Sequence, residues 1–200
     1  MSERGVKQHS EMTRGLLLVI SGPSGVGKDT VIKRLLELDP NLKYSVSYTT
    51  RPPRPGEVDG VDYGFVNRGD FERLIREGAL LEHATYDGHL YGTPIAPLDE
   101  ARAAGKDIVL KIDVQGAEQV RKRARDALRI FLAPPNMDEL LRRRTERHSE
   151  SPLDQTARQL IAKDEMALAP HFDHVVINDD LERAVQEVLA IIRLARERHT

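Results

Sequence analysis

Hydrophobic positions along the chain follow two alternating patterns. Short apolar runs, typical of strands buried on both faces of a parallel sheet, predict strands over 15–21, 107–113, 128–133 and 174–177. Between them, apolar residues recur at helical spacing and predict helices from Lys28 to just before Pro40, and over 97–104, 117–125 and 180–196. Strands that alternate with helices indicate a three-layer α/β fold around a central parallel sheet.

The segment 44–66 has a different pattern, because prolines and glycines interrupt its alternating residues and prevent a helix. A short helix over 70–77, a strand over 79–86 and a turn at Asp87-Gly88 are expected to follow. These features predict a small β-rich lobe over 47–92. The lobe is expected to be inserted into a core made of 15–46, 93–136 and 169–200.

Two polar helices are predicted over 137–148 and 154–168, with a polar break between them at 149–152. A pair of helices joined by a flexible turn is typical of a movable lid, which here covers 137–168. Residues 1–14 show no apolar periodicity and are expected to form a flexible tail. The remainder, 15–200, is then a single domain.

The composition excludes several classes of protein. The chain of 200 residues contains no cysteine, which excludes disulfide frameworks and thiol chemistry and fits the reducing cytoplasm. Its 30 basic and 32 acidic residues give a net charge of -2, so the overall charge does not favour binding to a nucleic acid. The longest apolar run, 16–20, is too short to cross a bilayer. We therefore expect a cytoplasmic protein without nucleic-acid, membrane or obligatory protein partners, and the seven histidines, which show no metal-ligand spacing, are assigned no role.

The turn between the first strand and the first helix carries the clearest chemical signal. It matches the first seven positions of the phosphate-loop pattern with Gly22, Pro23, Ser24, Gly25, Val26, Gly27 and Lys28. Glycines let successive backbone N–H groups converge on phosphate oxygens at the positive end of the helix dipole, and the lysine neutralises the β and γ phosphates. The alternative is an ordinary glycine-rich turn, but the position between a buried strand and a helix favours a phosphate site.

The eighth position of this pattern is unusual. Asp29, followed by Thr30, stands where a serine or threonine usually ligates magnesium. A carboxylate oxygen can bind Mg²⁺, so Asp29 is a candidate metal ligand; a first-turn carboxylate favoured by the helix dipole is the alternative. Lys111 and Asp113 lie two apart at the end of the strand 107–113 and should project to one face. We expect Lys111 to offset the charge of Asp29, unless it extends into solvent.

The stretch 49–66 suggests a second phosphate site. Arg51 and Arg54, three apart in a proline-rich turn, form with the hydroxyl of Tyr63 a suitable fork for a terminal phosphate monoester. A solvated basic turn is the alternative. Together with the phosphate loop, this stretch closely resembles the signature of the guanylate kinase family, and the similarity extends from Gly15 to the last helix.

The resemblance implies a P-loop kinase fold with a central parallel sheet, an acceptor-binding lobe and a helical lid. It implies transfer of the γ-phosphoryl group of ATP to GMP, with dGMP as a second expected acceptor, giving ADP and GDP with Mg²⁺. The family's positions for the GMP phosphate match Arg51, Arg54, Tyr63 and Tyr91, and those for guanine match Ser47, Glu82, Thr93 and Asp113. Carboxylates suit guanine because its N1–H and N2–H₂ donors lie together on one edge.

The resemblance also implies roles for an arginine-rich helix. Arg143 and Arg147 lie four apart on one helical face, Arg158 lies on the next helix, and all three match the family's lid arginines. Lid closure would bring these charges onto the reacting phosphates, where they stabilise the transition state of a direct in-line transfer. With Lys28 and Arg51 they are the candidate catalytic residues. Asn178 resembles the family's adenine-contacting stretch and, like Asp29 and Thr30, is a candidate ATP-binding residue.

Some questions stay open at this point. The family commonly has a hydroxyl residue in place of Asp29 and a carboxylate in place of Lys111, which leaves the metal geometry undetermined. A kinase with a sugar-phosphate acceptor, such as a ribose bisphosphate kinase, is one alternative function, and a peptide-binding scaffold module without catalysis is another. Glu82 and the stretch 49–66 favour guanine, and Lys28 with the lid arginines favours catalysis.

Overall fold

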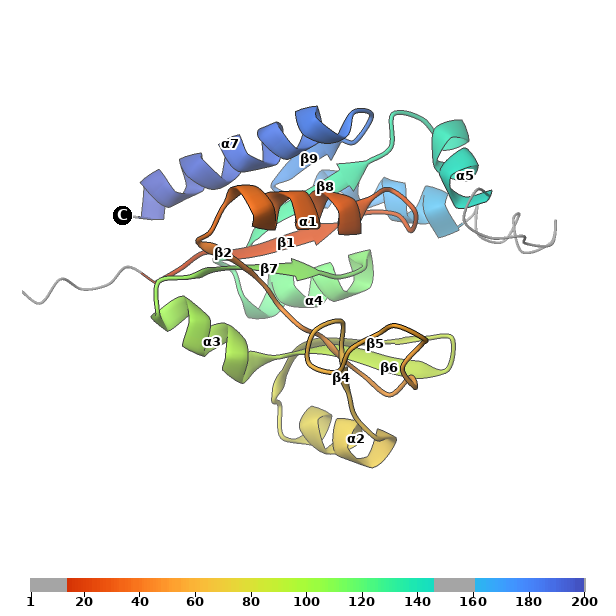
Figure 1. Ribbon diagram of the computed structural model, residues 1–200, viewed down its shortest axis with the longest axis vertical. Coiled ribbons are helices and arrows are strands. Elements are labelled where there is room, and N and C mark those ends of the chain that lie inside the picture. Colours follow the sequence, from red (N-terminus) through yellow and green to blue (C-terminus); the bar gives the residue numbers. More distant parts are fainter. Residues whose placement is uncertain (1–13, 146–160, 200) are drawn as a thin grey trace, which may run out of the picture.

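The central strand of the main sheet is β1 (Leu17–Ser21), whose five residues are all buried. The computed structural model describes residues 14–145 and 161–199. Within these ranges, the main sheet has five parallel strands in the order β2-β7-β1-β8-β9 (Figure 1). The flanking strands are β2 (Leu42–Tyr44), β7 (Asp107–Lys111), β8 (Leu128–Ala133) and β9 (His174–Ile177).

Both faces of the main sheet are covered by helices, as the apolar runs predict. On one face, Leu18 and Ile20 of β1 belong to the core formed with α1 (Lys28–Leu38) and α7 (Leu181–His199). On the other face, Leu17 and Val19 pack with residues of α3 (Ile95–Ala103) and α4 (Val114–Arg123). Figure 1 shows the two helix pairs on opposite sides of the sheet. The three-layer α/β fold is therefore confirmed.

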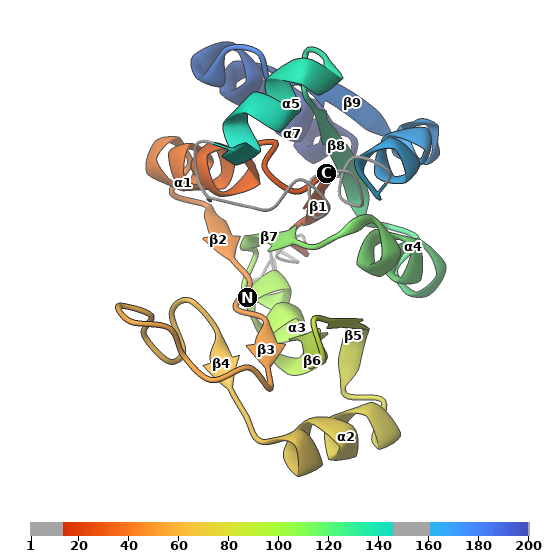
Figure 2. The same ribbon diagram turned by 90° about the vertical axis from the view of Figure 1, so that its right-hand side faces the viewer.

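A second, smaller sheet has the strand order β4-β3-β6-β5 in the described part of the chain. Its strands are β3 (Tyr48–Thr49), β4 (Gly64–Phe65), β5 (Leu80–Tyr86) and β6 (His89–Pro94). The helix α2 (Arg68–Arg76) covers it through Phe71, which packs with Leu80 and Leu90. In Figure 2 the small sheet and α2 lie below the main sheet, on the side of α3 and α4. Two hydrogen bonds between Gln119 of α4 and the backbone of His83 in β5 join this sheet to the core.

Several elements begin or end at other residues than the sequence predicts. The strand predicted to reach Asp113 ends at Lys111, and the following helix starts at Val114 instead of 117. The reason is that the side chain of Asp113 accepts a hydrogen bond from Gly116 N, at 2.7 Å, and so forms the N-cap of α4. The three-residue strand β2 was not predicted, because only Leu42 in it is buried.

The C-terminal third agrees with the predicted elements where it is described. The arginine-rich helix α5 covers Met137–Thr145, and residues 161–167 are helical. They are followed by the single turn η1 (Ala169–His171). The predicted break at 149–152 and residues 1–13 of the expected tail lie outside the described residues. No helix in the described ranges is both long and apolar enough to cross a membrane.

A half-buried arginine and two buried carboxylates fasten α7 to the core. Arg196 Nη2 lies 2.5 Å from Asp39 Oδ2 and 2.6 Å from Asp107 Oδ2. Asp39 is the C-cap residue of α1 and Asp107 begins β7, and both carboxylates are buried. Asp107 also accepts a hydrogen bond from Leu16 N at 2.7 Å. The cluster therefore joins three elements on which the main sheet depends.

We expect Arg196→Met to lower the free energy of unfolding by about 2 kcal/mol, because two buried carboxylates lose their shared cationic partner. Urea denaturation followed by circular dichroism measures this change. Arg198→Met is the matched control, since it removes the same charge from an exposed position of the same helix. Equal effects of the two substitutions would contradict the structural role assigned to Arg196.

Candidate functional site

The phosphate-loop motif lies at the carboxyl edge of the main sheet, between β1 and α1. Its backbone conformation favours glycine at three positions. Gly22, Gly25 and Gly27 have φ angles of 138°, 87° and 100°, which other residues rarely adopt. A Cβ atom on Gly22 would lie 2.2 Å from Leu132 O, and one on Gly27 would lie 2.6 Å from Asn178 Nδ2. The loop is thus held closely against the ends of β8 and β9.

Lys28, the first residue of α1, turns back onto the loop. Its Nζ donates to the carbonyl oxygens of Gly22, at 2.5 Å, and Pro23, at 3.2 Å. Burial lowers the pKa of Lys28 to about 8, and the neighbouring carboxylates of Glu165 and Asp29 act in the opposite direction. The ammonium group therefore lies within the curl of the loop, where an anion bound to the loop would meet it.

The end of β7 lies beside the start of α1. Lys111 pairs in register with Ile20 of β1, and its Nζ lies 2.5 Å from Asp29 Oδ1. The expected contact between Lys111 and Asp29 is therefore confirmed, and Lys111 does not extend freely into solvent, since its side chain is 24% exposed. The carboxylate of Asp29 is 72% exposed and accessible to a ligand.

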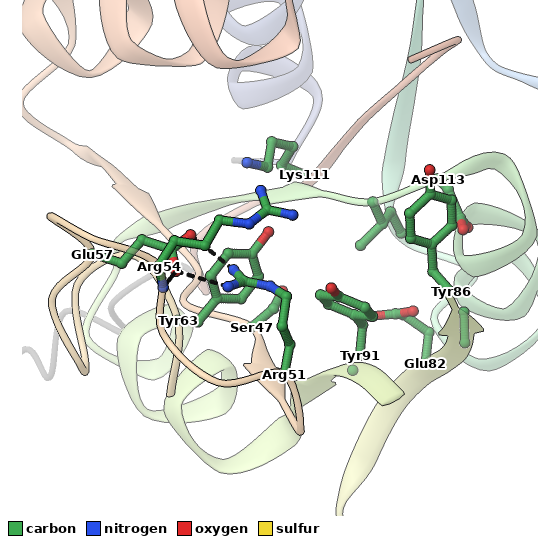
Figure 3. A pocket seen from close by; sticks show the side chains of 13 residues that line it. Ser47, Arg51, Arg54, Glu57, Tyr63, Glu82, Tyr86, Tyr91, Lys111 and Asp113 are labelled. Atoms are coloured by element: carbon green, nitrogen blue, oxygen red, sulfur yellow. Dashed lines mark hydrogen bonds and ion pairs between the residues drawn. The ribbon is translucent and has the colours of Figure 1, made fainter. Parts of the chain in front are cut away.

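A pocket of about 330 Å³ lies between the end of β7 and the small sheet, and we call it the inter-sheet pocket (Figure 3). It brings together most of the residues that the sequence predicts as a GMP site. These lining residues are Ser47, Arg51, Arg54, Tyr63, Glu82, Tyr91 and Asp113. Thr93, the remaining predicted residue, contacts Glu82 at the edge of this group. Seven residues separated in the sequence by up to 66 positions thus share one cavity.

One end of the inter-sheet pocket is cationic. Arg51 is only 9% exposed, and its two terminal nitrogens donate to Glu57 at 2.8 and 3.0 Å. Its guanidinium carbon lies 5.5 Å from the ring centre of Tyr63 and 5.8 Å from that of Phe65. The hydrogen bond from Arg51 lowers the pKa of Glu57. Figure 3 shows Arg54 and Lys111 near the same end.

The opposite end of the pocket is acidic. Glu82 is 4% exposed and accepts a hydrogen bond from the hydroxyl of Thr93 at 2.6 Å. Burial and, to a smaller extent, the nearby Asp113 together raise the pKa of Glu82 to about 7. Gly116 gives this carboxylate its space, because a Cβ atom there would lie 2.7 Å from Glu82 Oε2. The carboxylates of Glu82 and Asp113 are thus hydrogen-bond acceptors at the end of the pocket opposite its arginines.

A second hollow of about 370 Å³ lies on the other side of the phosphate loop and is lined by Gly25, Gly27, Thr30, Arg143, Asn178, Asp179 and Leu181. Asn178 donates from Nδ2 to Val26 O at 2.8 Å and so fastens the loop. Arg143 donates from Nη1 to Asn178 O at 3.0 Å and from Nε to Glu139 at 2.7 Å. Arg147 and Arg158, the other two expected lid arginines, lie outside the described residues.

Sequence reasoning missed three residues of the inter-sheet pocket and its surroundings. Glu57 holds Arg51, Gly116 makes room for Glu82, and Tyr86 lines the pocket. Glu57 lies in the conspicuous stretch 49–66, but nothing in the sequence pairs it with Arg51. The glycine in the first turn of α4 was a usable signal, since glycine is unfavourable inside a helix unless another group approaches closely.

The main sheet and the loop define the class of protein. A parallel α/β sheet with the phosphate-loop motif between its central strand and a helix is the arrangement of P-loop nucleotide-binding proteins. More specifically, the chain belongs to the guanylate kinase family, because the family model "Guanylate kinase" matches residues 14–195. It is therefore a nucleoside monophosphate kinase, and the resemblance inferred from the sequence is confirmed.

Individual relatives agree with this assignment. A guanylate kinase of Thermus thermophilus is 52% identical over 185 residues, which cover 92% of this chain and 84% of that protein. The guanylate kinase of Rubrobacter xylanophilus is 48% identical over 182 residues, covering 91% and 95%. A crystal structure of guanylate kinase from Anaplasma phagocytophilum superimposes with a TM-score of 0.75 at 36% identity, covering 91% of this chain and 86% of that one.

The raised pKa of Glu82 predicts a pH-dependent gain in stability on substitution. Between the ordinary value of 4.5 and about 7, the folded chain binds a proton that the unfolded chain releases. The free energy of unfolding therefore falls as the pH rises through this window. Glutamine does not titrate, so the Glu82→Gln variant lacks this pH-dependent loss. We therefore compare its free energy of unfolding with that of the unsubstituted chain. The variant's value relative to the unsubstituted chain should rise by about 2 kcal/mol between about pH 5 and about pH 8.

Urea denaturation at both pH values measures this difference. A difference that stays constant with pH would show that burial does not perturb the carboxyl group of Glu82.

Proposed function

We propose that this guanylate kinase transfers the γ-phosphoryl group of ATP to GMP, and also to dGMP, in the inter-sheet pocket, as a step of purine nucleotide metabolism in the cytoplasm. One observation carries the assignment of the pocket. Arg51 and Arg54 lie at one end of the pocket and Glu82 and Asp113 at the other (Figure 3). Lys111, which also lines the pocket, contacts Asp29, the residue after the phosphate-loop lysine. GMP has the complementary arrangement, with a dianionic phosphate at one end and the hydrogen-bond donors of guanine at the other.

The acceptor nucleotide would lie along the pocket. At the cationic end, Arg51 and Arg54 would bind the phosphate of GMP with the hydroxyls of Tyr63 and Tyr91. Arg51 is already oriented by Glu57, so binding costs little side-chain entropy. At the acidic end, Glu82 and Asp113 would accept from N1–H and N2–H₂ of guanine, and the hydroxyls of Ser47 and Thr93 would complete the base site. Adenine lacks this pair of donors, which accounts for selectivity.

ATP would bind on the phosphate loop, with its phosphates against the backbone N–H groups of residues 22–30 and the ammonium group of Lys28. The position of Asn178, which fastens the loop and lines the second hollow, supports a contact near the adenine. Arg143 lines the same hollow with Gly25 and Gly27 of the loop, and would there contact the triphosphate. We propose that the lid 137–168 closes over this site against the core and the lobe 47–92, and that closure brings Arg147 and Arg158 to it.

The residues at the loop fit a magnesium ion. Mg²⁺ is commonly held by one or two carboxylates together with substrate phosphates and water, and Asp29 offers an exposed carboxylate beside the loop. The ion pair with Lys111 uses one of its two oxygens. A preformed cluster of three acidic or histidine ligands is absent from the described residues, and none is needed when phosphates supply the other oxygens. Bound with ATP, Mg²⁺ would neutralise charge on the β and γ phosphates.

The remaining catalytic work is positioning and electrostatic stabilisation. The phosphate of GMP is itself an anionic nucleophile near neutral pH, so neither a covalent intermediate nor a general base is required. Lys28 and Arg143 would stabilise charge on the donor, and Arg51 would align the acceptor for in-line attack. Closure of the lid would exclude water, which would otherwise accept the phosphoryl group.

A coupled assay of ATP consumption tests the function, with GMP, dGMP, AMP and a ribose phosphate as acceptors, with and without magnesium. We expect turnover with GMP and dGMP that requires magnesium, and little with AMP. Strong phosphorylation of the sugar phosphate and none of GMP would contradict the proposal. Binding of GMP without turnover would instead favour a non-catalytic module.

The pKa of Glu82 predicts a pH dependence of guanine binding. Only the ionised carboxylate can accept two hydrogen bonds from guanine, so the affinity for guanosine should fall as the pH is lowered below about 7, towards a limit of about tenfold per pH unit. Guanosine is used because it has no phosphate that titrates in this range. Calorimetric titrations between about pH 5.5 and about pH 8 measure the effect.

Glu82→Gln is the matched variant for this experiment. At high pH this variant should bind guanosine more weakly than the unsubstituted chain does. Its affinity should then fall little further as the pH is lowered. If the variant retained the full pH dependence of the unsubstituted chain, Glu82 would not be the titrating group.

A further inference from the structure

The ammonium group of Lys111 lies where the phosphate loop meets the inter-sheet pocket. Lys111 is the last residue of β7 and lines that pocket together with Arg51 and Arg54 (Figure 3). At the same time, it forms an ion pair with Asp29 in the first turn of α1. No other residue in the described part of the chain both lines this pocket and forms an ion pair with the loop helix.

Lys111 keeps its charge and has a proton to donate. The ion pair with Asp29 favours the charged ammonium form of this side chain. An ammonium group has three N–H donors. Asp29 accepts one at 2.5 Å, and the hydroxyl of Tyr44 is a further hydrogen-bond partner. The third donor remains for a ligand in the pocket.

Stabilisation of the fold does not explain this ion pair well. The carboxylate of Asp29 is 72% exposed, and ion pairs with such exposed partners contribute little to stability. The Asp29 carboxylate does, however, hold a flexible lysine side chain in one place at the wall of the pocket. An oriented cation of this kind costs less side-chain entropy when it binds an anion.

We propose that Lys111 binds the phosphate of the acceptor nucleotide as a third cation beside Arg51 and Arg54, and that Asp29 is the positioning residue that holds it there. This inference rests on the proposed function, because it requires GMP in the inter-sheet pocket. It also gives a role to Asp29 and Lys111, the two positions at which this chain departs from the family pattern. The cation lies on the acceptor side, and the carboxylate lies on the loop that would bind ATP.

The first test compares GMP with guanosine by calorimetry, without ATP or metal, in Lys111→Met. Loss of a charged hydrogen bond to the phosphate should weaken GMP binding about tenfold or more. Guanosine binding should stay within about twofold, because guanosine has no phosphate. Lys111→Arg should recover part of the affinity for GMP. Lys106→Met is the matched control, since Lys106 lies at the opposite end of β7 and contacts Asn41.

The second test distinguishes a Lys111 side chain that binds phosphate from one that only stabilises the fold. Asp29→Asn should weaken GMP binding by a smaller factor than Lys111→Met does, and it should leave guanosine binding unchanged. This variant also tests the proposal if Lys111→Met does not fold. The reversed pair, Asp29→Lys with Lys111→Asp, restores an ion pair but moves the cation to the loop. It should bind GMP at least as weakly as Lys111→Met.

Three results would overturn the inference. In the first, Lys111→Met binds GMP as tightly as the unsubstituted chain does. In the second, Lys111→Met weakens the binding of guanosine and of GMP by the same factor. In the third, the reversed pair restores the affinity for GMP. Each of these leaves the proposed function intact. Absence of GMP binding by the unsubstituted chain would instead overturn the proposed function and this inference with it.

Discussion

The parallel pairing of β1 with β7 and β8 is the constraint on which the rest of the site depends. Parallel neighbours end at the same edge of a sheet, so whatever follows each strand meets at that edge. The phosphate loop follows β1, Lys111 ends β7, and Asn178 follows β9. The pairing therefore brings together groups from distant parts of the chain, and contacts such as that of Asn178 Nδ2 with Val26 O then hold them in place. Buried apolar residues on both faces of β1 hold the strands in this register.

The small sheet adds a second site whose charges are separated. Its cationic end depends on Glu57, which fixes the guanidinium of Arg51, and its acidic end depends on the burial of Glu82. A buried carboxylate is unfavourable unless enough donors surround it, and this is the physical origin of its raised pKa. In our proposal, guanine supplies further donors to this carboxylate. A base without those donors would leave Glu82 buried and unsatisfied, and this difference makes the site selective for guanine.

Much of this arrangement could be predicted from the sequence, because local patterns determine it. The apolar run 15–21 and the glycine loop after it define a buried strand and a phosphate site, and the resemblance to a family added the residues of the second site. Other features depend on contacts that no local pattern reveals. Asp113 reads as the end of a strand but caps a helix through Gly116 N. Glu57 binds Arg51 and Gly116 makes room for Glu82, and these partners can be identified only in the folded chain.

The central claim is that the phosphate loop and the inter-sheet pocket form one continuous site for two nucleotides. The most direct test is calorimetry with adenosine and guanosine joined through their 5′ oxygens by a polyphosphate chain. We expect one molecule of this compound to bind per chain, more tightly than ATP or GMP alone, and to be displaced by either nucleotide. Binding that ATP displaces and GMP does not, or binding no tighter than that of ATP, would contradict the claim.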